Sequence, residues 1–312
     1  MSLFQVPILT NGATHSAQQF RMLIRDLARG NEGITQGDDL KVTQRSTPGG
    51  GVTVSDGSAI IKGRDNAFQG HYASCNVGSV DIDIAPTSST ARSDMLILRI
   101  EDPEYTGSLN PATQAINYFQ VISNVSSSAT AIPDGRTGIP LARIDIPSST
   151  ATITSAMITD LRKVANPRRD RTLWTQSPSS SSTLIGGNTS QFFYFTTAAG
   201  WNIPVPDWAT QVKIRLDIAG LRLTAANVYG GVRGIFGTAL LMQPVTVDDN
   251  QGTATRRLTA IAADTLTIPS TYRGTTQLLR AQFAGYSGNT GTVNVDASST
   301  LIADVEFFEA PR

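Results

Sequence analysis

The stretch GIPLARIDIPSSTATITSAMITDLRKVA, residues 138–165, decides the fold of the first half of this chain. Apolar and polar residues alternate in LARIDIP (141–147) and again in TATIT (150–154). Successive side chains of a strand point to opposite faces, so this alternation predicts half-buried β-strands. A charged pair, Asp160 and Arg162, then closes the run. Only 16% of the residues in this chain are charged, so the placement of this pair needs an explanation.

The same period of two extends upstream through a series of short apolar runs. These runs are LKVTQ (40–44), VTVSDGSAIIKG (52–63), HYASCNV (71–77), VDIDIA (80–85), DMLILRIED (94–102) and NYFQVIS (117–123). Clusters rich in Ser, Thr, Pro and Gly separate them, and Asp56-Gly57 is typical of a tight hairpin. We therefore expect a β domain over residues 1–165.

One helix is expected near the start of this domain. Its apolar residues fall at i, i+3, i+4 and i+7, namely Phe20, Leu23, Ile24 and Leu27. Ser16 is placed to cap the N-terminus, with Gln19 at the spacing of a capping box. Gly30 is a suitable stop. The pattern predicts an amphipathic helix from about Ser16 to Arg29, whose apolar face is available to neighbouring subunits.

A change of composition follows the first domain. Residues 166–182, NPRRDRTLWTQSPSSSS, begin with a basic cluster and end in a Ser/Pro run, so we expect an interdomain linker. A second series of alternating runs with Gly-rich turns then fills residues 183–312. The expected fold is mainly β: an N-terminal β domain with one amphipathic helix, then a C-terminal β-sandwich of jelly-roll type.

Composition excludes several classes of partner. Lys plus Arg and Asp plus Glu number 25 each, which gives no electrostatic basis for binding nucleic acid or an anionic membrane. No apolar run approaches the ~20 residues that span a bilayer, so membrane insertion is not expected. The start, MSLFQVPILTNG, lacks the pattern of a signal peptide. We expect synthesis in the cytoplasm without export by the usual route; if the protein works outside the cell, it leaves in another way, for instance by lysis.

Residues suited to catalysis are few. The chain has two histidines, His15 and His71, and one cysteine, Cys75, without metal-ligand spacing among them. Cys75 lies in an apolar run and is interpreted as a core thiol. No pair of carboxylates can be assigned as the acid and base of a glycosidase from sequence. We expect no metal, no cofactor and no enzymatic activity.

Aromatic residues of the C-terminal half are the candidates for ligand binding. They are Trp201, Trp208, Tyr229, Tyr272 and Tyr286, which lie in turn-like segments next to Gly, Pro or Arg. Exposed aromatic side chains can stack on the apolar faces of sugars. The alternative is that both tryptophans fill the sandwich core or a subunit interface.

The opening stretch also resembles a module of tail proteins from siphovirus-type bacteriophages. In that module an Arg-x-Asp precedes an apolar strand, a Pro-Leu-Ala strand follows, and an Asp-x-Arg closes it. The matching residues are Arg92, Asp94, Pro140, Leu141, Ala142, Asp160 and Arg162. The resemblance covers residues 13–165. Residues 201–312 resemble, more loosely, terminal domains of minor tail proteins from phages of actinobacteria.

This resemblance implies a structural protein of the phage tail tip or baseplate. Such proteins are commonly homotrimers, contact other phage tail proteins, and turn their distal domain toward the host. On that basis we expect a virion location and attachment of the C-terminal domain to a glycan of the host cell envelope. Two alternatives stay open: a tail decoration that binds no receptor, and a depolymerase that cuts surface glycan.

The resemblance also gives the charged motifs a structural interpretation. Arg92 and Asp94 lie two apart, as do Asp160 and Arg162, so each pair shares one face of its strand. We hypothesise that the pairs meet crosswise, Arg92 with Asp160 and Asp94 with Arg162, and fix the register of the closing segment. The alternative is two ordinary surface charge pairs.

Overall fold

The computed structural model describes residues 11–12, 16–196 and 200–312, and it is mainly β-structure, as the sequence predicts. The chain divides into two compact units. Unit 1 contains Met1–Pro167 together with Ala310–Arg312, and unit 2 contains Arg168–Glu309. The last three residues of the chain therefore belong to the first unit.

Unit 1 is built from three antiparallel sheets, with strand orders β1-β4-β5, β2-β3-β6 and β10-β9-β7-β8. Their bounds are β1 Gly33–Ile34, β2 Val42–Gln44, β3 Gly51–Val54, β4 Gly57–Lys62, β5 His71–Asn76, β6 Val80–Asp83, β7 Arg92–Ile100, β8 Asn117–Val125, β9 Gly138–Ile146 and β10 Ile158–Asp160, with a 3-10 turn η1 at Ser155–Met157. The opening stretch supplies β9, whose Leu141 and Ile144 are fully buried in the core of this unit. Alternation in LARIDIP thus gives the expected half-buried strand.

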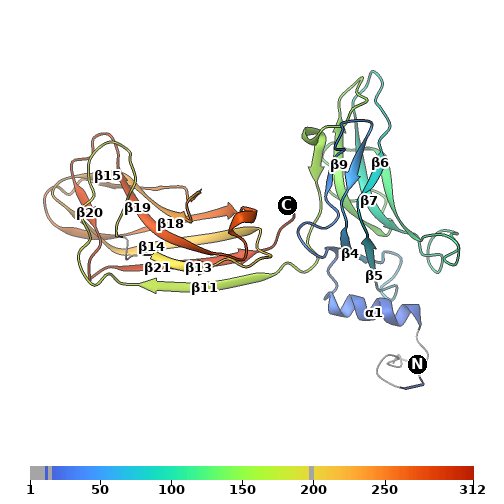
Figure 1. Ribbon diagram of the computed structural model, residues 1–312, viewed down its shortest axis with the longest axis horizontal. Coiled ribbons are helices and arrows are strands. Elements are labelled where there is room, and N and C mark those ends of the chain that lie inside the picture. Colours follow the sequence, from blue (N-terminus) through green and yellow to red (C-terminus); the bar gives the residue numbers. More distant parts are fainter. Residues whose placement is uncertain (1–10, 13–15, 197–199) are drawn as a thin grey trace. The chain divides into compact units, whose positions relative to one another are not determined.

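The helix α1, Ala17–Leu27, lies across the ends of β4 and β5 (Figure 1). Ser16 caps it, and the capping box with Gln19 is present, as the sequence predicts. The helix ends two residues earlier than expected, because Arg29 and Gly30 both adopt positive φ angles. Among its described residues only Arg21 is buried, so the apolar residues do not face the core of unit 1.

Unit 2 is a β-sandwich of two antiparallel sheets, with strand orders β11-β21-β14-β18 and β12-β19-β15-β16. Strand β20 also pairs with β14, β13 with β19 and β17 with β15. Their bounds are β11 Arg169–Gln176, β12 Phe193–Tyr194, β13 Gly200–Pro204, β14 Gln211–Thr224, β15 Val228–Phe236, β16 Leu240–Leu241, β17 Val245–Asp249, β18 Arg256–Thr267, β19 Thr276–Gly285, β20 Thr292–Asn294 and β21 Thr300–Phe308, with a 3-10 turn η2 at Ser270–Tyr272. We refer to the two as the β14 sheet and the β15 sheet.

The prediction of a linker at 166–182 is wrong for residues 169–176. Residues 169–176 form β11, which pairs with β21 along its full length. Trp174 packs partly against the core of unit 2, and the basic residues meet carboxylates across the strand: Arg171 bonds Asp304 and Arg169 bonds Glu306. The basic cluster is therefore one side of an ion-pair ladder. Residues 166–168 and the Ser-rich part, 177–182, lie outside the strands.

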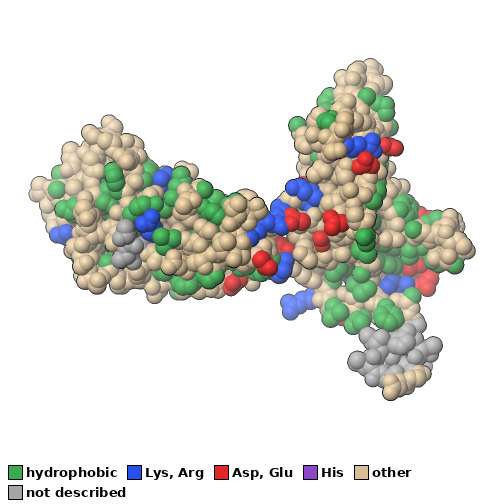
Figure 2. Space-filling view, viewed as in Figure 1, with side chains coloured by type: hydrophobic (Ala, Val, Ile, Leu, Met, Phe, Trp, Pro, Cys, Tyr) green, Lys and Arg blue, Asp and Glu red, His purple; other side chains and the backbone are tan. Residues whose placement is uncertain are grey.

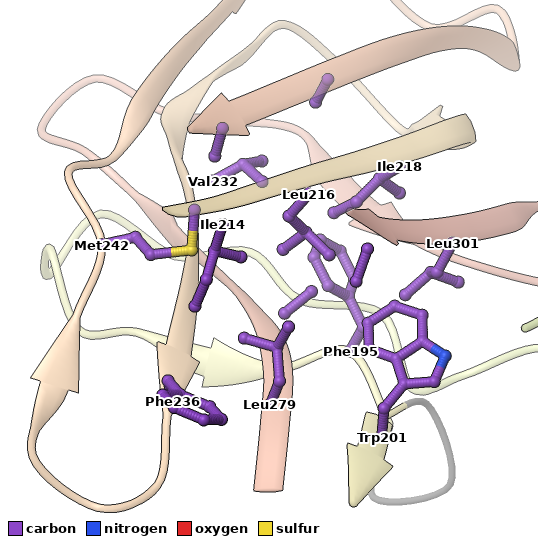
Figure 3. Close-up of a cluster of buried hydrophobic side chains, with 14 of the residues drawn as sticks. Phe195, Trp201, Ile214, Leu216, Ile218, Val232, Phe236, Met242, Leu279 and Leu301 are labelled. Carbon is purple, nitrogen blue, oxygen red and sulfur yellow. The ribbon is translucent and has the colours of Figure 1, made fainter. Parts of the chain in front are cut away.

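The core of unit 2 lies between its two sheets. Figure 3 shows side chains from both sheets, among them Leu216, Leu279 and Phe236, pointing toward one another. On β14 the buried residues alternate with exposed ones from Val212 to Ile218. A bulge at Gly220, with φ of +75°, then restores the inward direction at Leu221.

Candidate functional site

Each charged motif of unit 1 forms an ion pair between its own two residues. On β7, Arg92 Nε donates to Asp94 Oδ1 at 2.8 Å. Asp94 has no exposed surface, and its Oδ1 also accepts the backbone N–H of Asn124 at 3.0 Å. Arg92 donates a further bond to the carbonyl of Ala85 at 2.6 Å. The pair therefore fixes β7 to the end of β8 and to the loop before β7.

The second motif is centred on Arg162. Its side chain is fully buried and donates to Asp160 Oδ2 at 2.7 Å. Three backbone carbonyls accept its remaining N–H groups: Asp39 at 2.6 Å, Gly37 at 3.4 Å and Arg312 at 3.0 Å. Arg162 therefore joins the 37–39 loop to the last residue of unit 1.

The crosswise pairing that we hypothesised is wrong. Strand β9 lies between β7 and β10 in the sheet, so residues of β7 and β10 are two strand spacings, roughly 10 Å, apart. Arg92 cannot reach Asp160 across that separation. Each arginine instead pairs with the carboxylate two residues away along the chain.

A third pair of the same kind lies on β9 and was missed. Arg143 Nε donates to Asp145 Oδ1 at 2.9 Å, and Ser93 on β7 donates to the same oxygen at 2.6 Å. These bonds lower the pKa of Asp145, the Arg143 bond being the larger cause. The signal was present in LARIDIP, which also contains an Arg-x-Asp. Such a pair thus occurs on β7, on β9 and at the end of β10, which indicates a structural role.

Arg21 is the residue that attaches α1 to the rest of unit 1. Its guanidinium is 3.2 Å from Asp102 and 2.6 Å from Glu104, and its Nε donates to the carbonyl of Gln69 at 2.9 Å. It also lies over the rings of Tyr72 and Tyr105. Burial and the hydrogen bond to Asp102 raise the pKa of Tyr72. The helix is therefore held by a polar cluster.

This attachment leaves the apolar side of α1 uncovered by the described residues. Leu23 is 36% exposed and Leu27 is 73% exposed, and Phe68 on the neighbouring loop is 58% exposed. An open hollow of about 360 Å³ lies beside the helix, lined by Ile24, Leu27, Ala28, Ile60, Ala73 and Cys75 among others. We call these exposed apolar residues with the hollow the helix surface.

The remaining candidates for chemistry do not form a site. Cys75 is exposed, so the interpretation as a core thiol is wrong; its side chain points away from the core at alternate positions of β5. His71 is buried, and neither ring nitrogen has a hydrogen-bond partner among the described residues. His15 lies outside the described residues. Within the described ranges, no three His, Cys, Asp or Glu side chains are grouped to hold a metal ion, and no helix is long and apolar enough to cross a membrane.

Two of the five aromatic candidates in unit 2 are core residues. Trp201 is 6% exposed and lies among the core side chains in Figure 3. Tyr272 is 7% exposed, and its hydroxyl accepts the backbone N–H groups of Thr238 and Ala239. Their placement as ligand-binding residues is wrong, because Trp201 occupies an inward position of β13 opposite Leu279. Trp208 packs partly against the core and lies under the guanidinium of Arg168.

The other two candidates, Tyr229 and Tyr286, lie together. Their ring centroids are 5.6 Å apart in an edge-to-face arrangement. The buried Asn289 supports both segments, because its Oδ1 accepts the N–H of Tyr229 at 2.9 Å and its own N–H donates to the carbonyl of Tyr286 at 2.9 Å. Tyr229 is 40% exposed. The structure therefore presents this pair at the surface on a fixed backbone.

Four further residues, not considered from sequence, extend this pair into a larger surface. The guanidinium of Arg233 lies 3.7 Å from the centroid of Phe192, and that of Arg280 lies 3.5 Å from the centroid of Tyr194. We call the combined set the arginine–tyrosine face. It consists of Phe192, Tyr194, Tyr229, Arg233, Arg280 and Tyr286.

Strand register explains why these residues share one side of the β15 sheet. Gln282 on β19 is opposite both Tyr194 on β12 and Arg233 on β15. Arg280 precedes Gln282 by two residues, and Tyr229 precedes Arg233 by four, so all of them point outward. A Cβ atom at Gly231 would lie 2.1 Å from the Tyr286 hydroxyl and 3.3 Å from the Phe192 ring. Glycine at 231 is what lets these rings lie against the sheet.

The outer face of the β14 sheet differs from the arginine–tyrosine face in how its arginines are paired. There the cations meet carboxylates, as in Arg171 with Asp304 and Arg257 with Asp296. Those bonds lower the pKa of Asp304 and of Asp296, the arginine hydrogen bond being the larger cause in both. Figure 2 shows that the surface in view is mostly free of charged side chains, in keeping with the composition. Among the described residues, Arg233 and Arg280 have no carboxylate partner.

Comparison with known proteins shows no family. No family model matches the chain, and no curated protein matches it. Among solved structures, the VP2 subviral particle of infectious bursal disease virus is 14% identical, covers 89% of this chain and 78% of its own, and has a TM-score of 0.22. The T=1 particles derived from infectious bursal virus are 12% identical, cover 93% and 84%, and have a TM-score of 0.24.

A third similar structure is the mosquito-larvicidal Cry4Aa toxin from Bacillus thuringiensis, which is 10% identical and covers 90% of this chain and 54% of its own, with a TM-score of 0.22. TM-scores of this size do not support any inference from those proteins to this one. The function must be argued from the surfaces of the two units.

Proposed function

We propose that this chain is a structural component of a virion, in the tail tip or baseplate of a siphovirus-type phage, and that unit 2 attaches the particle to a glycan of the host cell envelope. The single observation that carries the attachment is the arginine–tyrosine face. It presents aromatic rings on a rigid β-sheet, outside the core and supported by buried Asn289. The resemblance of residues 13–165 to tail proteins supports the location.

The face suits carbohydrate because it combines apolar ring surface with free polar atoms. The hydroxyls of Tyr194, Tyr229 and Tyr286 form no hydrogen bond with another described residue, so they can bond sugar hydroxyls. Tyrosine supplies both kinds of contact at a low cost in side-chain entropy. A flat face of this kind gives weak binding per copy. Several copies on one particle would raise the overall affinity through effective concentration.

Unit 1 would provide assembly. Its charged pairs hold the fold, and the helix surface supplies exposed apolar side chains on a helix fixed by Arg21. We propose that this surface packs against neighbouring copies in a homotrimer or against other phage tail proteins. Closed cyclic assemblies are the usual form of homo-oligomers, and a threefold one fits a tail axis.

The assembly part is tested by light scattering on the full chain. A homotrimer would have about three times the chain mass of 33.2 kDa. The variant Leu27→Lys places a charge in the apolar contact and is expected to give monomers of unchanged thermal stability, because Leu27 is 73% exposed in the single chain. The matched control is Val77→Lys, at a residue that is 91% exposed and does not belong to the helix surface. A wild-type monomer at high concentration would reject self-association and leave tail proteins as the partners.

The attachment part is tested by adsorption of phage particles that carry variant chains. Tyr229→Ser with Tyr286→Ser removes the aromatic pair without touching the core. We expect slower adsorption by such particles, while Leu173→Ser, at a 63% exposed position on β11, leaves adsorption unchanged. Particles that assemble normally and adsorb at the wild-type rate despite loss of both tyrosines would reject attachment through this face. They would favour the decoration without receptor binding.

The direction of the pKa shifts of two carboxylates argues against the alternative of a depolymerase. A glycosidase acid needs a raised pKa so that it holds a proton near neutral pH. Arginine hydrogen bonds shift Asp296 and Asp304 the other way, toward a lower pKa. Release of reducing ends from host envelope by the purified chain is the measurement that would revive an enzymatic role.

A further inference from the structure

We propose that the arginine–tyrosine face selects an acidic glycan, and that Arg233 and Arg280 contact its carboxylate or phosphate groups. This inference rests on the proposed function, since it takes the ligand to be a glycan, and adds the chemical class of that glycan. The inference is based on the two arginines of this face, which have no carboxylate partner among the described residues.

The first step is the contrast in pairing between the two outer faces of unit 2. On the β14 sheet, Arg171 and Arg257 each bond a carboxylate at 2.5 and 2.7 Å. On the β15 sheet, Arg233 bonds the neutral amide of Gln282 at 3.0 Å, and Arg280 contacts the Tyr194 ring. Arginines on the outer face of the β14 sheet are thus paired with carboxylates, whereas Arg233 and Arg280 on the outer face of the β15 sheet are not.

The second step is the state of the Arg233 side chain. Burial lowers its pKa, because the charged guanidinium has lost water without gaining a carboxylate. Gln282, which accepts from Nε, is 5% exposed, and the hydrogen bond between them is partly buried. A partly desolvated cation attracts an anion more strongly than one in bulk water. The guanidinium of Arg233 is therefore a favourable position for a negatively charged group of a ligand.

The third step is geometry. A guanidinium stacked on a ring keeps its N–H groups in its own plane, where an anion can reach them. Nε of Arg233 is used by Gln282, which leaves its two terminal nitrogens for a ligand. Arg280 is diagonal to Arg233 across the β15–β19 pair, so the two residues lie roughly 7–8 Å apart and their Cβ atoms somewhat less. Long side chains that start at that spacing can contact one acidic group together or neighbouring acidic residues of a polymer.

The rings define the rest of the ligand. Phe192 and Tyr194 hold the arginines in fixed orientations, so little side-chain entropy is lost on binding. The Tyr229–Tyr286 pair continues the same face and can stack on sugar rings beside the acidic group. A ligand that is only charged would leave these rings unused. The combination therefore favours an acidic polysaccharide over a simple polyanion.

The experiment measures binding of the full chain to immobilised polymers by biolayer interferometry in 50 and 300 mM NaCl. Polygalacturonate carries carboxylates, poly(glycerol phosphate) carries phosphates, dextran is a neutral glycan, and polyglutamate is an acidic polymer without sugars. We expect at least tenfold tighter binding to one of the first two polymers than to dextran and polyglutamate. Which of them binds identifies the acidic group. Binding should weaken with salt, since screening reduces charge attraction.

The decisive variant is Arg233→Gln with Arg280→Gln, and the matched control is Arg171→Gln on the β14 sheet. The double variant is expected to lose at least tenfold in affinity for the acidic polymer and most of its salt dependence, while the control stays within twofold of wild type. Equal melting temperatures would show that the variants are folded. The variant Arg233→Lys should bind with an affinity between those of wild type and the double variant. Lysine keeps the positive charge but lacks the planar guanidinium with its paired N–H donors.

Four outcomes would each overturn the inference. Dextran could bind as tightly as the acidic glycans, polyglutamate could bind equally well, the double variant could bind like wild type, or the chain could bind none of the four polymers. The proposed attachment is judged separately by adsorption of the tyrosine variants. If those variants adsorb poorly and particles with the arginine variants adsorb normally, attachment stands and the preference for acidic glycan fails.

Discussion

Arg162 donates to the carboxylate of Asp160, two residues earlier on its own segment, at 2.7 Å. The Asp160 side chain is 44% exposed and the Arg162 side chain is fully buried. The carboxylate therefore serves to neutralise a cation whose other bonds reach three backbone carbonyls. The same division recurs on β7 with the roles exchanged, since there Asp94 is the buried partner and Arg92 the more exposed one.

The buried carboxylate of Asp94 gives the first prediction. Asp94→Ala leaves Arg92 and the N–H of Asn124 without their acceptor, so we expect unit 1 to lose about 3 kcal/mol of unfolding free energy. Asp83→Ala is the control: Asp83 also pairs with an arginine, but its side chain is 92% exposed. It should cost little. Urea unfolding measures both; equal losses in the two variants would show that burial of the pair is not what matters.

Attachment of α1 through Arg21 gives the second prediction. Arg21→Met keeps the length of the side chain and leaves Asp102, whose side chain is 7% exposed, without its cation. We expect a loss of about 3–5 kcal/mol and faster proteolysis near residues 16–30 as the helix detaches. Leu27→Ala, on the exposed side of the same helix, should change neither. Unchanged proteolysis in Arg21→Met would mean that other contacts hold the helix.

Gly231 gives the third prediction. In Gly231→Ala the new methyl group would meet the Tyr286 hydroxyl, so that ring must move away from the sheet. We expect weaker glycan binding with only a small change in melting temperature, since the displaced atom is at the surface end of a side chain. The control is Gly49→Ala in unit 1, where φ is not positive and a Cβ atom would make only an ordinary contact with Thr47. Equal binding by both variants would argue against a fixed tyrosine pair.

The ion-pair ladder of the β14 sheet gives a prediction on pH. The Arg171 hydrogen bond lowers the pKa of Asp304 in the folded state below its ordinary value of 3.8. A depressed pKa means that the unfolded chain takes up the proton more readily, so this stabilisation is present above pH 3.8 and is lost as the pH falls through the folded value. Asp304→Asn should therefore flatten the decline in stability between about pH 4 and pH 2.

Urea unfolding at a series of pH values measures that slope. Arg171→Gln removes the other partner of the same pair and should flatten the decline to a similar degree. A slope that persists in both variants would place the acid sensitivity in other carboxylates, such as Asp296, whose pKa Arg257 lowers in the same way.

Local pattern was sufficient for several features of this protein. The alternation in LARIDIP specifies a half-buried strand wherever it pairs, because the side-chain period of a strand is two. The capping box at Ser16 and Gln19 depends on residues three apart and is equally local. The mainly β fold with one helix and a C-terminal sandwich followed from such patterns.

Tertiary structure decided which residues meet. The position of β9 between β7 and β10 prevents the crosswise pairing of Arg92 with Asp160, and strand order cannot be read from spacing along the chain. The basic run at 168–171 was predicted to belong to a linker, because its carboxylate partners on β21 lie more than a hundred residues away in the sequence. Trp201 and Tyr229 looked alike in sequence, and sheet register put one in the core and the other at the surface.

The arginine–tyrosine face shows the same limit most clearly. Its members come from β12, β15, β19 and the segments beside them, and their side-chain directions depend on which residue lies opposite Gln282. The sequence by itself determined the local conformations, because these depend on neighbours within a few positions. The partner of each charge and ring was decided by strand order and register, which arise from contacts between distant segments.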